Sequence, residues 1–316
     1  MTKERYGTMP DGCEVFAYTL ENNKFKAKFL NFGAAIDQLW VPDKHGNAAN
    51  ILIGHPDLED RIANNTCRGE VCGRVCNRIS GAKFELNGTV HHVTPNPEGR
   101  FCLHGAKEFN TAVWDAEPLG DHAIAFRYTS PAGMHGFPGE LQTCVRYTLE
   151  GNALRIEFEA HSDADTVVNL TNHAYFNLAG AGSGTIFHQE LRIDAAHYLP
   201  LSEELCPTGE LACVAGTRFD FRQMRKIAED YDINFCNPGA IEARDPASGR
   251  RMQVQTDLPG VQLYTGECLC EPHTGFCLET QLWPDAPNQS GFPSAVLRAG
   301  ETWKSRTKFI FDADHA

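Results

Sequence analysis

Apolar and polar residues alternate with a period of two along much of this chain. Between residues 145 and 149 every second side chain is apolar, and residues 154–158 repeat the pattern after Gly151-Asn152. Alternation of this kind is typical of strands that bury one face, and the Gly-Asn step between the two segments predicts a hairpin. The pattern therefore indicates antiparallel β structure.

Further strands are predicted on both sides of this hairpin. Asn87-Gly88 is a favoured two-residue turn, which predicts a second hairpin within residues 83–93. Residues 124–128 alternate in the same way, and Ser130-Pro131 ends this run. Near the end of the chain, Lys304, Arg306 and Lys308 alternate with Ser305, Thr307 and Phe309. Strand patterns thus recur from one end of the chain to the other.

Helical patterns are few and short. The best candidates are residues 56–64 and 221–229. No change in composition, internal repeat or Ser/Gly-rich linker divides the chain. We therefore expect an all-β fold, a large antiparallel β-sandwich of packed sheets with few short helices, and a single domain over residues 1–316.

Composition narrows the class of partner. The chain has 316 residues and a formal net charge of −13, which disfavours nucleic acid and anionic membranes as partners, because both require a basic surface. No segment is apolar enough to span a bilayer, and the first residues lack the apolar stretch of a secretion signal. The twelve cysteines are therefore interpreted as reduced thiols in a cytoplasmic protein.

Motifs for the common cofactors are missing from the sequence. The glycine-rich run at residues 180–184 lacks the spacing of a dinucleotide-binding loop, and there is no P-loop or nucleophile elbow. Cys72 and Cys76 lack a second ligand pair at zinc-finger spacing, and so do Cys268 and Cys270. We expect no metal and no cofactor, so that any catalysis uses side chains alone.

Polar residues interrupt three otherwise apolar segments. Strand geometry places His173 and Tyr175 on one face of residues 169–178, and Glu279 on one face of residues 275–283. Gln262 occupies the same kind of position within residues 260–265. Carboxylates, amides and aromatic rings on sheet faces are suited to a sugar, because rings stack on a pyranose and polar groups bond its hydroxyls.

Six regions of the chain carry recognisable motifs in a fixed order. They are residues 31–34 with 52–60, residues 73–79 (Gly-Arg-Val-Cys-Asn-Arg-Ile), residues 103–105 (Leu-His-Gly), residues 171–178 (Thr-Asn-His-Ala-Tyr-Phe-Asn-Leu), residues 259–265 and residues 278–281 (Leu-Glu-Thr-Gln). Together they resemble the aldose 1-epimerases, also called galactose mutarotases, nearly end to end. The resemblance implies the galactose-mutarotase-like supersandwich fold and the interconversion of α and β anomers of free aldohexoses such as galactose or glucose.

The resemblance also implies roles for individual residues. It assigns Glu279 as the base at the C1 hydroxyl and His173 as the acid at the ring oxygen, although the residues alone would allow the reverse. It places His104 with them as a catalytic group, which with Arg78 would steady the charge that develops near C1 and the ring oxygen. It makes a small-molecule sugar the partner, bound by a monomer or a homodimer.

The remaining candidate residues would bind the sugar. By the same resemblance Asn77, Asp232 and Gln262, together with Arg78, would hold its hydroxyl groups. Tyr175 and Trp283 lie in these motifs too, but large aromatic side chains in strands more often pack than bind, so we interpret them as packing residues.

Two alternatives stay open. A non-catalytic sugar-binding or sensor protein of the same fold would keep the aromatic and amide groups, whereas a hexose-phosphate 1-epimerase would require a cluster of basic residues. The chain departs from the family pattern at Cys76, Ala174, Ile233 and residues 106–111. These departures bear on substrate preference more than on reaction type, since the candidate acid and base are present.

Overall fold

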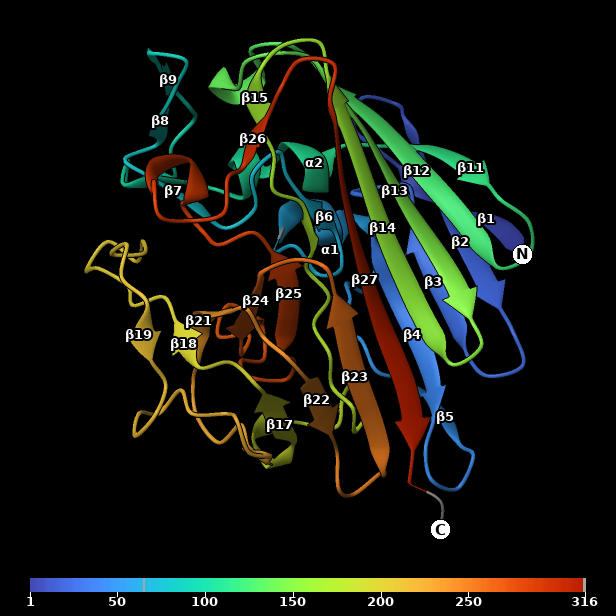
Figure 1. Ribbon diagram of the computed structural model, residues 1–316. Helices are drawn as coiled ribbons and strands as arrows, with labels where there is room; N and C mark the ends of the chain where they lie inside the picture. Colours follow the sequence, from blue (N-terminus) through green and yellow to red (C-terminus); the bar gives the residue numbers. More distant parts are fainter. Residues whose placement is uncertain (65, 315–316) are drawn as a thin grey trace.

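An antiparallel sheet of nine strands forms the largest layer among the described residues, 1–64 and 66–314, of this computed structural model (Figure 1). Its central hairpin closes on Gly151-Asn152, with Glu150 opposite Ala153, which confirms the predicted turn. In sheet order, the strands are β11 (Asp115–Pro118), β12 (Ala123–Ser130), β13 (Leu141–Glu150), β14 (Ala153–Ser162), β27 (Thr302–Ala313), β23 (Arg250–Thr256), β22 (Ile241–Arg244), β17 (Glu190–Ile193) and β20 (Arg225–Lys226).

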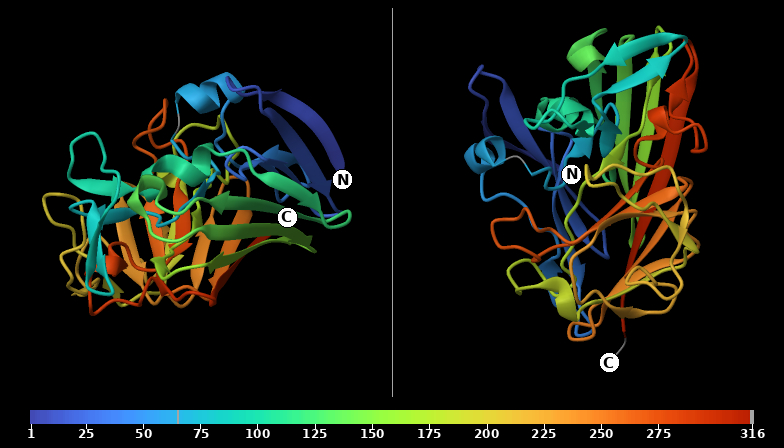
Figure 2. Two further views of the ribbon diagram at one scale, coloured as in Figure 1. Left: turned by 90° about the horizontal axis from the view of Figure 1, so that it is seen from above. Right: turned by 90° about the vertical axis from the view of Figure 1, so that its left-hand side faces the viewer.

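A five-stranded meander packs on the inner face of this sheet. Figure 2 shows the two layers from two sides. Aromatic rings join them, since Phe29 stacks on Tyr147 with ring centroids 4.8 Å apart and Tyr18 meets Phe126 edge-on at 5.9 Å. Burial of these large rings supplies much of the driving force for the sandwich. The strands are β1 (Thr2–Thr8), β2 (Glu14–Glu21), β3 (Lys26–Leu30), β4 (Ile36–Pro42) and β5 (Ala48–Asn50).

A second five-stranded sheet carries two of the three polar segments identified in the sequence, residues 260–265 and 275–283. Val261, Leu263 and Leu278 point from it into the main apolar core, so its alternate residues are turned to the opposite face. In sheet order, the strands are β19 (Ala212–Cys213), β18 (His197–Tyr198), β21 (Asp232–Cys236), β24 (Gly260–Tyr264) and β25 (Cys277–Gln281).

Short paired strands complete the connections between the large sheets. One of them, the hairpin at Asn87-Gly88, was predicted from its turn, and the structure confirms it. The pairs are β6 (Val71–Cys72) with β16 (Thr171–Asn172), β7 (Arg78–Ser80) with β10 (Phe101–Leu103), β8 (Lys83–Leu86) with β9 (Thr89–His92), and β15 (Thr166–Val167) with β26 (Val296–Leu297).

Helices are short, as predicted. The Asp57 side chain caps α1 (Leu58–Ala63) by accepting the Asp60 backbone N–H at 2.8 Å, which confirms the helix expected within residues 56–64. The other helices are α2 (Glu108–Thr111) and the 3₁₀ turns η1 (His104–Lys107), η2 (Met134–Gly136), η3 (Ile186–His188) and η4 (Ala286–Asn288).

The helix predicted at residues 221–229 is wrong. Phe221 and Ile227 are both buried in the main core, but the chain between them bends at residues 222 and 223 and then pairs as β20 with β17 of the large sheet. Ala228 then adopts a positive φ of 60°. The two buried side chains, Phe221 and Ile227, thus flank a short strand and do not lie on one face of a helix.

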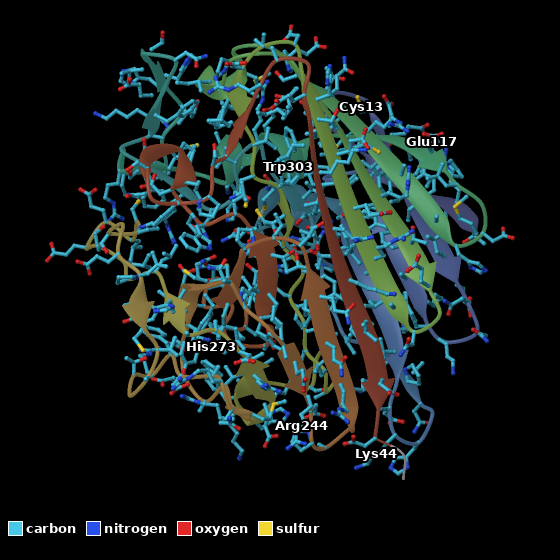
Figure 3. The ribbon with its side chains drawn as sticks, in the orientation of Figure 1. Cys13, Lys44, Glu117, Arg244, His273 and Trp303 are labelled. Carbon is cyan, nitrogen blue, oxygen red and sulfur yellow. The ribbon has the colours of Figure 1, made fainter. Side chains whose placement is uncertain are left out.

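The two edge strands of the large sheet are charged. Glu117 lies on the edge strand β11, and the opposite edge strand, β20, consists of the basic residues Arg225–Lys226. Figure 3 labels Glu117 and also Arg244, which lies on β22, two strands in from β20. Arg127 donates to Glu117 at 2.9 Å, and Arg244 to Glu190 at 2.5 Å, across neighbouring strands. Charged edges disfavour pairing with strands of other molecules.

The architecture confirms the predicted all-β sandwich with few short helices. In the part of the chain that the structure describes, no helix has the length and apolar character needed to cross a membrane.

Candidate active site

A cavity of about 400 Å³ opens beside β21, β24 and β25. Six of the seven residues predicted for the site line it, although they come from five separate stretches of the chain. They are Asn77, Arg78, His104, His173, Asp232 and Glu279. The cavity is therefore the candidate active site.

Glu279 and His173 meet at the base of the cavity. His173 Nε2 lies 3.6 Å from Glu279 Oε1, and the two residues are only 5% and 2% exposed. Within the described chain, the other carboxylate oxygen of Glu279 is buried without a hydrogen-bond partner. A carboxylate and an imidazole so close together can exchange protons with a bound hydroxyl group.

Backbone hydrogen bonds hold His173 in place. Its N–H donates to the Glu70 carbonyl at 3.0 Å, and its own carbonyl accepts from the Gly69 N–H at 3.0 Å. The neighbouring Asn172 side chain donates to the Gly69 carbonyl at 2.6 Å. Only Thr171–Asn172 forms a regular strand in this segment, yet alternation persists, because Ala174 and Phe176 enter the core while His173 and Tyr175 face the cavity.

His104 stands on a turn of unusual backbone geometry. His104 and the next three residues, through Lys107, all have positive φ values, between 50° and 66°. A Cβ at Gly105 would lie 2.0 Å from the Gly73 carbonyl oxygen, so only glycine fits this close approach. The turn of the Leu-His-Gly motif thus packs closely against Gly73, and this packing positions the His104 imidazole in the cavity wall.

Hydrogen bonds decide the tautomer of His104. The Asn77 backbone N–H donates to His104 Nδ1 at 3.2 Å. The backbone N–H of His104 in turn donates to the Asn77 carbonyl at 2.9 Å. Since Nδ1 accepts, the ring proton of the neutral imidazole is on Nε2. His104 therefore offers a hydrogen-bond donor to the cavity.

Arg78, Asp232 and Gln262 form one hydrogen-bonded chain. Arg78 Nη2 donates to Asp232 Oδ2 at 3.0 Å, and Gln262 Nε2 donates to Asp232 Oδ1 at 2.5 Å. The Arg78 guanidinium also lies over the Phe101 ring, 5.3 Å from its centroid. Gln262 itself is not among the cavity-lining residues, so it reaches the cavity through Asp232.

Asn77 and Arg78 both line the cavity, although adjacent strand residues normally face opposite sides. Asn77 precedes β7 and has a φ of 58°, which breaks the alternation. Its side-chain oxygen accepts the Arg78 backbone N–H at 2.9 Å. Sequence alternation alone could not reveal this local turn.

Burial sets the protonation of the central pair. Desolvation raises the pKa of Glu279 to about 8; the nearby Asp232 charge adds to the rise, whereas Arg78 opposes it. Desolvation also lowers the pKa of His173 to about 4. The pKa of His104 falls well below its ordinary value, first because of desolvation and then because His173 and Arg78 are near.

Two aromatic rings complete the cavity wall. Tyr175 stacks on His173 with centroids 5.0 Å apart, and Tyr264 meets the same imidazole edge-on at 6.3 Å. Tyr175 was interpreted from the sequence as a packing residue, but the structure places it at the cavity. Trp283 instead packs edge-on against Phe292 at 5.1 Å.

Other cavity residues had no signal in the sequence. Lys107 lines the cavity from the end of η1, and Leu205, Glu267 and Cys268 line it from loops, where neither periodicity nor a motif marks them. Among the residues described, no group of three or more His, Cys, Asp or Glu side chains is arranged to hold a metal ion.

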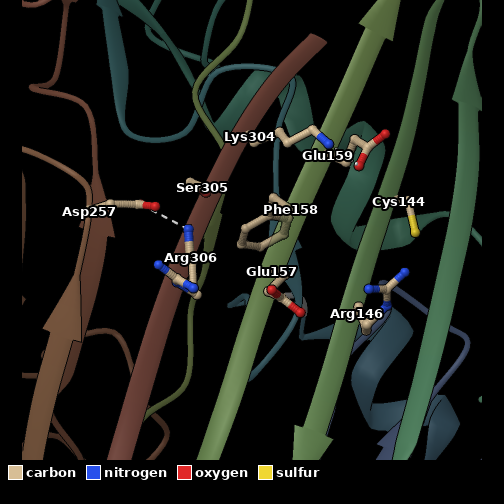
Figure 4. Close-up of a pocket in the computed structure, with 9 residues that line it drawn as sticks. All are labelled: Cys144, Arg146, Glu157, Phe158, Glu159, Asp257, Lys304, Ser305 and Arg306. Atoms are coloured by element: carbon tan, nitrogen blue, oxygen red, sulfur yellow. Dashed lines mark hydrogen bonds and ion pairs between the residues drawn. The ribbon is translucent and has the colours of Figure 1, made fainter.

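A second hollow, of about 290 Å³, lies on the large sheet (Figure 4). Its charges are compensated locally, since Lys304 Nζ lies 3.1 Å from Glu159 and the Arg306 backbone N–H donates to Asp257 at 2.9 Å. It contains no histidine and no aromatic ring besides Phe158. It therefore lacks the acid–base pair that distinguishes the first cavity.

Comparison with known proteins identifies the class to which this fold and site belong. A family model described as aldose 1-epimerase matches residues 17–309. The chain is 38% identical to the galactose mutarotase of Homo sapiens, with 98% of each chain covered, and 32% identical to the aldose 1-epimerase of Haemophilus influenzae, with 96% of this chain and 97% of the relative covered. The chain therefore belongs to the aldose 1-epimerase family.

Solved structures agree with this assignment. The crystal structure of galactose 1-epimerase from Lactobacillus acidophilus superposes with a TM-score of 0.88 at 25% identity, covering 99% of both chains. An aldose epimerase homologue from C. elegans gives a TM-score of 0.89 at 26% identity, covering 94% of this chain and 98% of that one. The predicted galactose-mutarotase-like fold is thus confirmed.

Most of the departures from the family pattern lie away from the cavity. Ile233 and Ala174 are buried in the main core, and Cys76 is fully buried and donates its thiol to Gln281 at 3.2 Å. Within residues 106–111 only Lys107 lines the cavity. Lys107 is therefore the departure with direct access to a bound ligand.

Proposed function

We propose that this protein is an aldose 1-epimerase that interconverts the α and β anomers of a free aldohexose, such as galactose or glucose. The observation that carries the proposal is the Glu279–His173 pair, 3.6 Å apart in a cavity of about 400 Å³. Membership of the aldose 1-epimerase family supports it. Anomer exchange requires one base and one acid on either side of the hemiacetal, and this pair supplies both.

Ring opening moves two protons. Glu279, as the carboxylate, takes the proton of the C1 hydroxyl while the C1–O5 bond breaks and the C1 carbonyl forms. His173, as the imidazolium, gives its proton to the ring oxygen, which leaves as a hydroxyl group. The pair holds one proton before and after this step, so the charge of the buried site does not change.

Ring closure reverses the proton positions. The aldehyde turns about the C1–C2 bond, so that its other face meets the C5 hydroxyl. His173 now takes the proton of that hydroxyl, and the protonated Glu279 returns one to the aldehyde oxygen. Because burial raises the pKa of Glu279 and lowers that of His173, the proton of the resting pair stays mainly on the carboxylate, which is the form that closes the ring.

Neighbouring groups would orient the sugar and stabilise the charge that develops in the transition state. His104 presents its Nε2–H donor to the cavity, and Arg78 presents its guanidinium beside Asp232. Both can stabilise negative charge on an oxygen of the opening ring. Asp232 and Asn77 line the same cavity and can bond hydroxyl groups that do not react.

The cavity favours a neutral sugar over a phosphorylated one. The two basic side chains that line it, Arg78 and Lys107, are matched in number by Asp232 and Glu267. Arg78 is already engaged by Asp232 at 3.0 Å. Among its described residues the cavity therefore lacks the cluster of unpaired basic side chains that a phosphate group would require, which disfavours the hexose-phosphate alternative.

Polarimetry tests the proposal directly. Freshly dissolved α-galactose and α-glucose should reach anomeric equilibrium faster with protein than in buffer, before and after exhaustive chelation. Failure to accelerate any common aldose would overturn the catalytic function. Bound sugar without acceleration, measured by calorimetry, would favour the sugar-binding alternative, and loss of activity on chelation would overturn the metal-free mechanism.

We further propose a cytoplasmic, monomeric or dimeric protein. Cys72, Cys76 and Cys277 are fully buried thiols in the apolar interior, and within the described residues the cysteines form no disulfide. When the protein is alkylated at the moment of lysis, almost all of its cysteines should be found as reduced thiols. If most of them were oxidised, the cytoplasmic assignment would be overturned. Light scattering after gel filtration measures the assembly state.

A further inference from the structure

The loop between β18 and β19 places a single leucine in the wall of the cavity (Figure 1). Leu205 is 42% exposed there, although most residues of the cavity wall carry polar groups. An isolated exposed leucine ordinarily needs no explanation, because apolar atoms make up much of any protein surface. The backbone of Leu205, however, distinguishes it from an ordinary surface leucine.

Leu205 has a left-handed backbone conformation, with a φ of 62°. This conformation brings the Cβ of an L-residue close to a carbonyl oxygen, and it is unusual for a bulky side chain. Among the described residues, no other leucine, isoleucine or valine has a positive φ. Strain of this kind persists only where the surrounding structure imposes it, and it concentrates at functional sites.

Three backbone hydrogen bonds impose the conformation of Leu205. The Leu205 N–H donates to the Ser202 carbonyl at 2.9 Å, and the Ser202 N–H donates to the Cys206 carbonyl at 2.8 Å. At the base of the turn, the Thr208 N–H donates to the Pro200 carbonyl at 2.9 Å. The turn is therefore closed on itself and holds Leu205 in one place.

The buried neighbour of Leu205 fixes this turn beside Arg78. Cys206 is only 3% exposed, and burial raises the pKa of its thiol to about 11; the charge of Asp285 adds to the rise, whereas the charge of Arg78 opposes it. The Asp285 backbone N–H also donates to the Arg78 carbonyl at 3.0 Å. Leu205 thus lines the cavity next to the guanidinium that pairs with Asp232.

We propose that Leu205 is a substrate-binding residue, held in a strained conformation so that its side chain covers C–H groups of the bound sugar. This role rests on the proposed function, in which the cavity binds a free aldohexose. A pyranose carries apolar C–H surface between its hydroxyl groups, and burial of that surface against a leucine favours binding. These C–H groups take no part in proton transfer, so the contact acts on KM rather than on kcat.

The test combines three variants of Leu205 with a matched control. Leu205→Ala shortens the side chain, Leu205→Met keeps an apolar side chain of similar size, and Leu205→Gly removes both the side chain and the strain. Leu211→Ala is the control, because Leu211 is 43% exposed in the same loop but has no positive φ and does not line the cavity. Polarimetry with galactose and glucose gives kcat and KM, nuclear magnetic resonance titration gives Kd, and denaturant midpoints report stability.

We expect Leu205→Ala to raise KM and Kd by about 5-fold and Leu205→Gly to raise them by about 5–10-fold, with kcat changed less than about 2-fold. Leu205→Met should stay within about 2-fold of the wild-type constants, because the apolar volume is kept. Leu205→Gly should keep or raise the denaturant midpoint, since glycine adopts a positive φ freely. Leu211→Ala should change neither binding nor turnover.

Three results would overturn the role of Leu205. They are unchanged KM and Kd in both truncated variants, a loss confined to kcat, and a lower denaturant midpoint in Leu205→Gly, which would show that the residue serves stability. Binding is measured without turnover, so Leu205-dependent binding without mutarotation would refute the proposed function alone. Normal mutarotation with unchanged constants would refute the role of Leu205 alone, and absence of any sugar binding would refute both.

Discussion

Glu279 and His173 share one proton over a wide range of pH. With pKa values of about 8 for Glu279 and about 4 for His173, the pair binds a second proton only in acid and loses its last proton only in alkali. Groups this close titrate as a pair, so the two values describe the pair rather than either residue alone. Between about pH 4 and about pH 8, the pair therefore holds the single proton that the proposed reaction requires.

A bell-shaped dependence of kcat/KM on pH follows from this shared proton. Activity should rise as pH increases through about 4, where the pair loses its second proton, and fall as pH increases through about 8, where no acid is left. Polarimetric rates across pH, corrected for buffer catalysis, measure both limbs. Activity that is flat beyond pH 9 would contradict the assignment.

Removal of either proton-transfer group should mainly lower kcat. We expect Glu279→Gln and His173→Asn to lose about 10²–10⁴-fold in kcat, because each removes one acid–base group while leaving a side chain of similar shape. Glu159→Gln is the control, since Glu159 is an exposed carboxylate paired with Lys304 on the large sheet. Near-normal kcat in Glu279→Gln would show that another residue is the base.

Asp232 and Gln262 should affect binding more than turnover. Asp232→Asn weakens the bond with Arg78 and the charge offered to sugar hydroxyls, so KM should rise by roughly 10–100-fold with a smaller change in kcat. Gln262→Ala should raise KM less, because Gln262 acts through Asp232. Loss of kcat at unchanged KM in Asp232→Asn would place Asp232 on the proton path instead.

Sequence reasoning located most of these residues but not all of their contacts. Strand alternation placed His173 and Glu279 on polar faces, and the structure brings those faces together. It could not show that a left-handed residue turns Asn77 toward the cavity, or that Gln262 stands behind Asp232. Such details depend on backbone turns and on packing between distant segments, which no local pattern encodes.

At the level of elements, the turn η1 is the most constrained part of the site. Gly105→Ala should destabilise the protein by at least about 2 kcal/mol, because the new Cβ both occupies a positive φ and collides with the Gly73 carbonyl. Displacement of His104 should also lower kcat. Denaturant midpoints and polarimetric rates measure the two effects.

Gly151→Ala separates the two causes. Gly151 has a φ of 58°, close to the 62° of Gly105, but a Cβ there meets nothing within 4 Å. It should therefore cost only the conformational penalty of about 1 kcal/mol and leave kcat unchanged. Equal destabilisation by the two variants would show that the approach to residue 73 is not tight.

Strands were easier to predict than the segments that join them. The hairpins at Gly151-Asn152 and Asn87-Gly88 were marked by favoured turns and by alternation. The segment at residues 221–229 was misread as a helix, because two buried side chains there are spaced by an extended stretch and a turn. Tertiary contacts decide such segments, and their patterns are too short to distinguish the two structures.

On the scale of the whole molecule, side chains from all three large sheets enter one apolar core. We therefore propose that residues 1–316 fold as a single domain, and predict one unfolding transition in which circular dichroism and tryptophan fluorescence coincide. Trp114 lies in the main core and Trp283 in the neighbouring cluster, so the fluorescence samples both. Two separated transitions would indicate independent units.

The position of β27 has a consequence for biosynthesis. This strand pairs with β14 along one side and with β23 along the other, and it follows both in the chain. A chain emerging from the ribosome therefore leaves two strand edges open until residues 302–313 are available. Open edges invite pairing between molecules. A pause in translation just before residue 302 would thus expose nascent chains to aggregation and increase their need for chaperones.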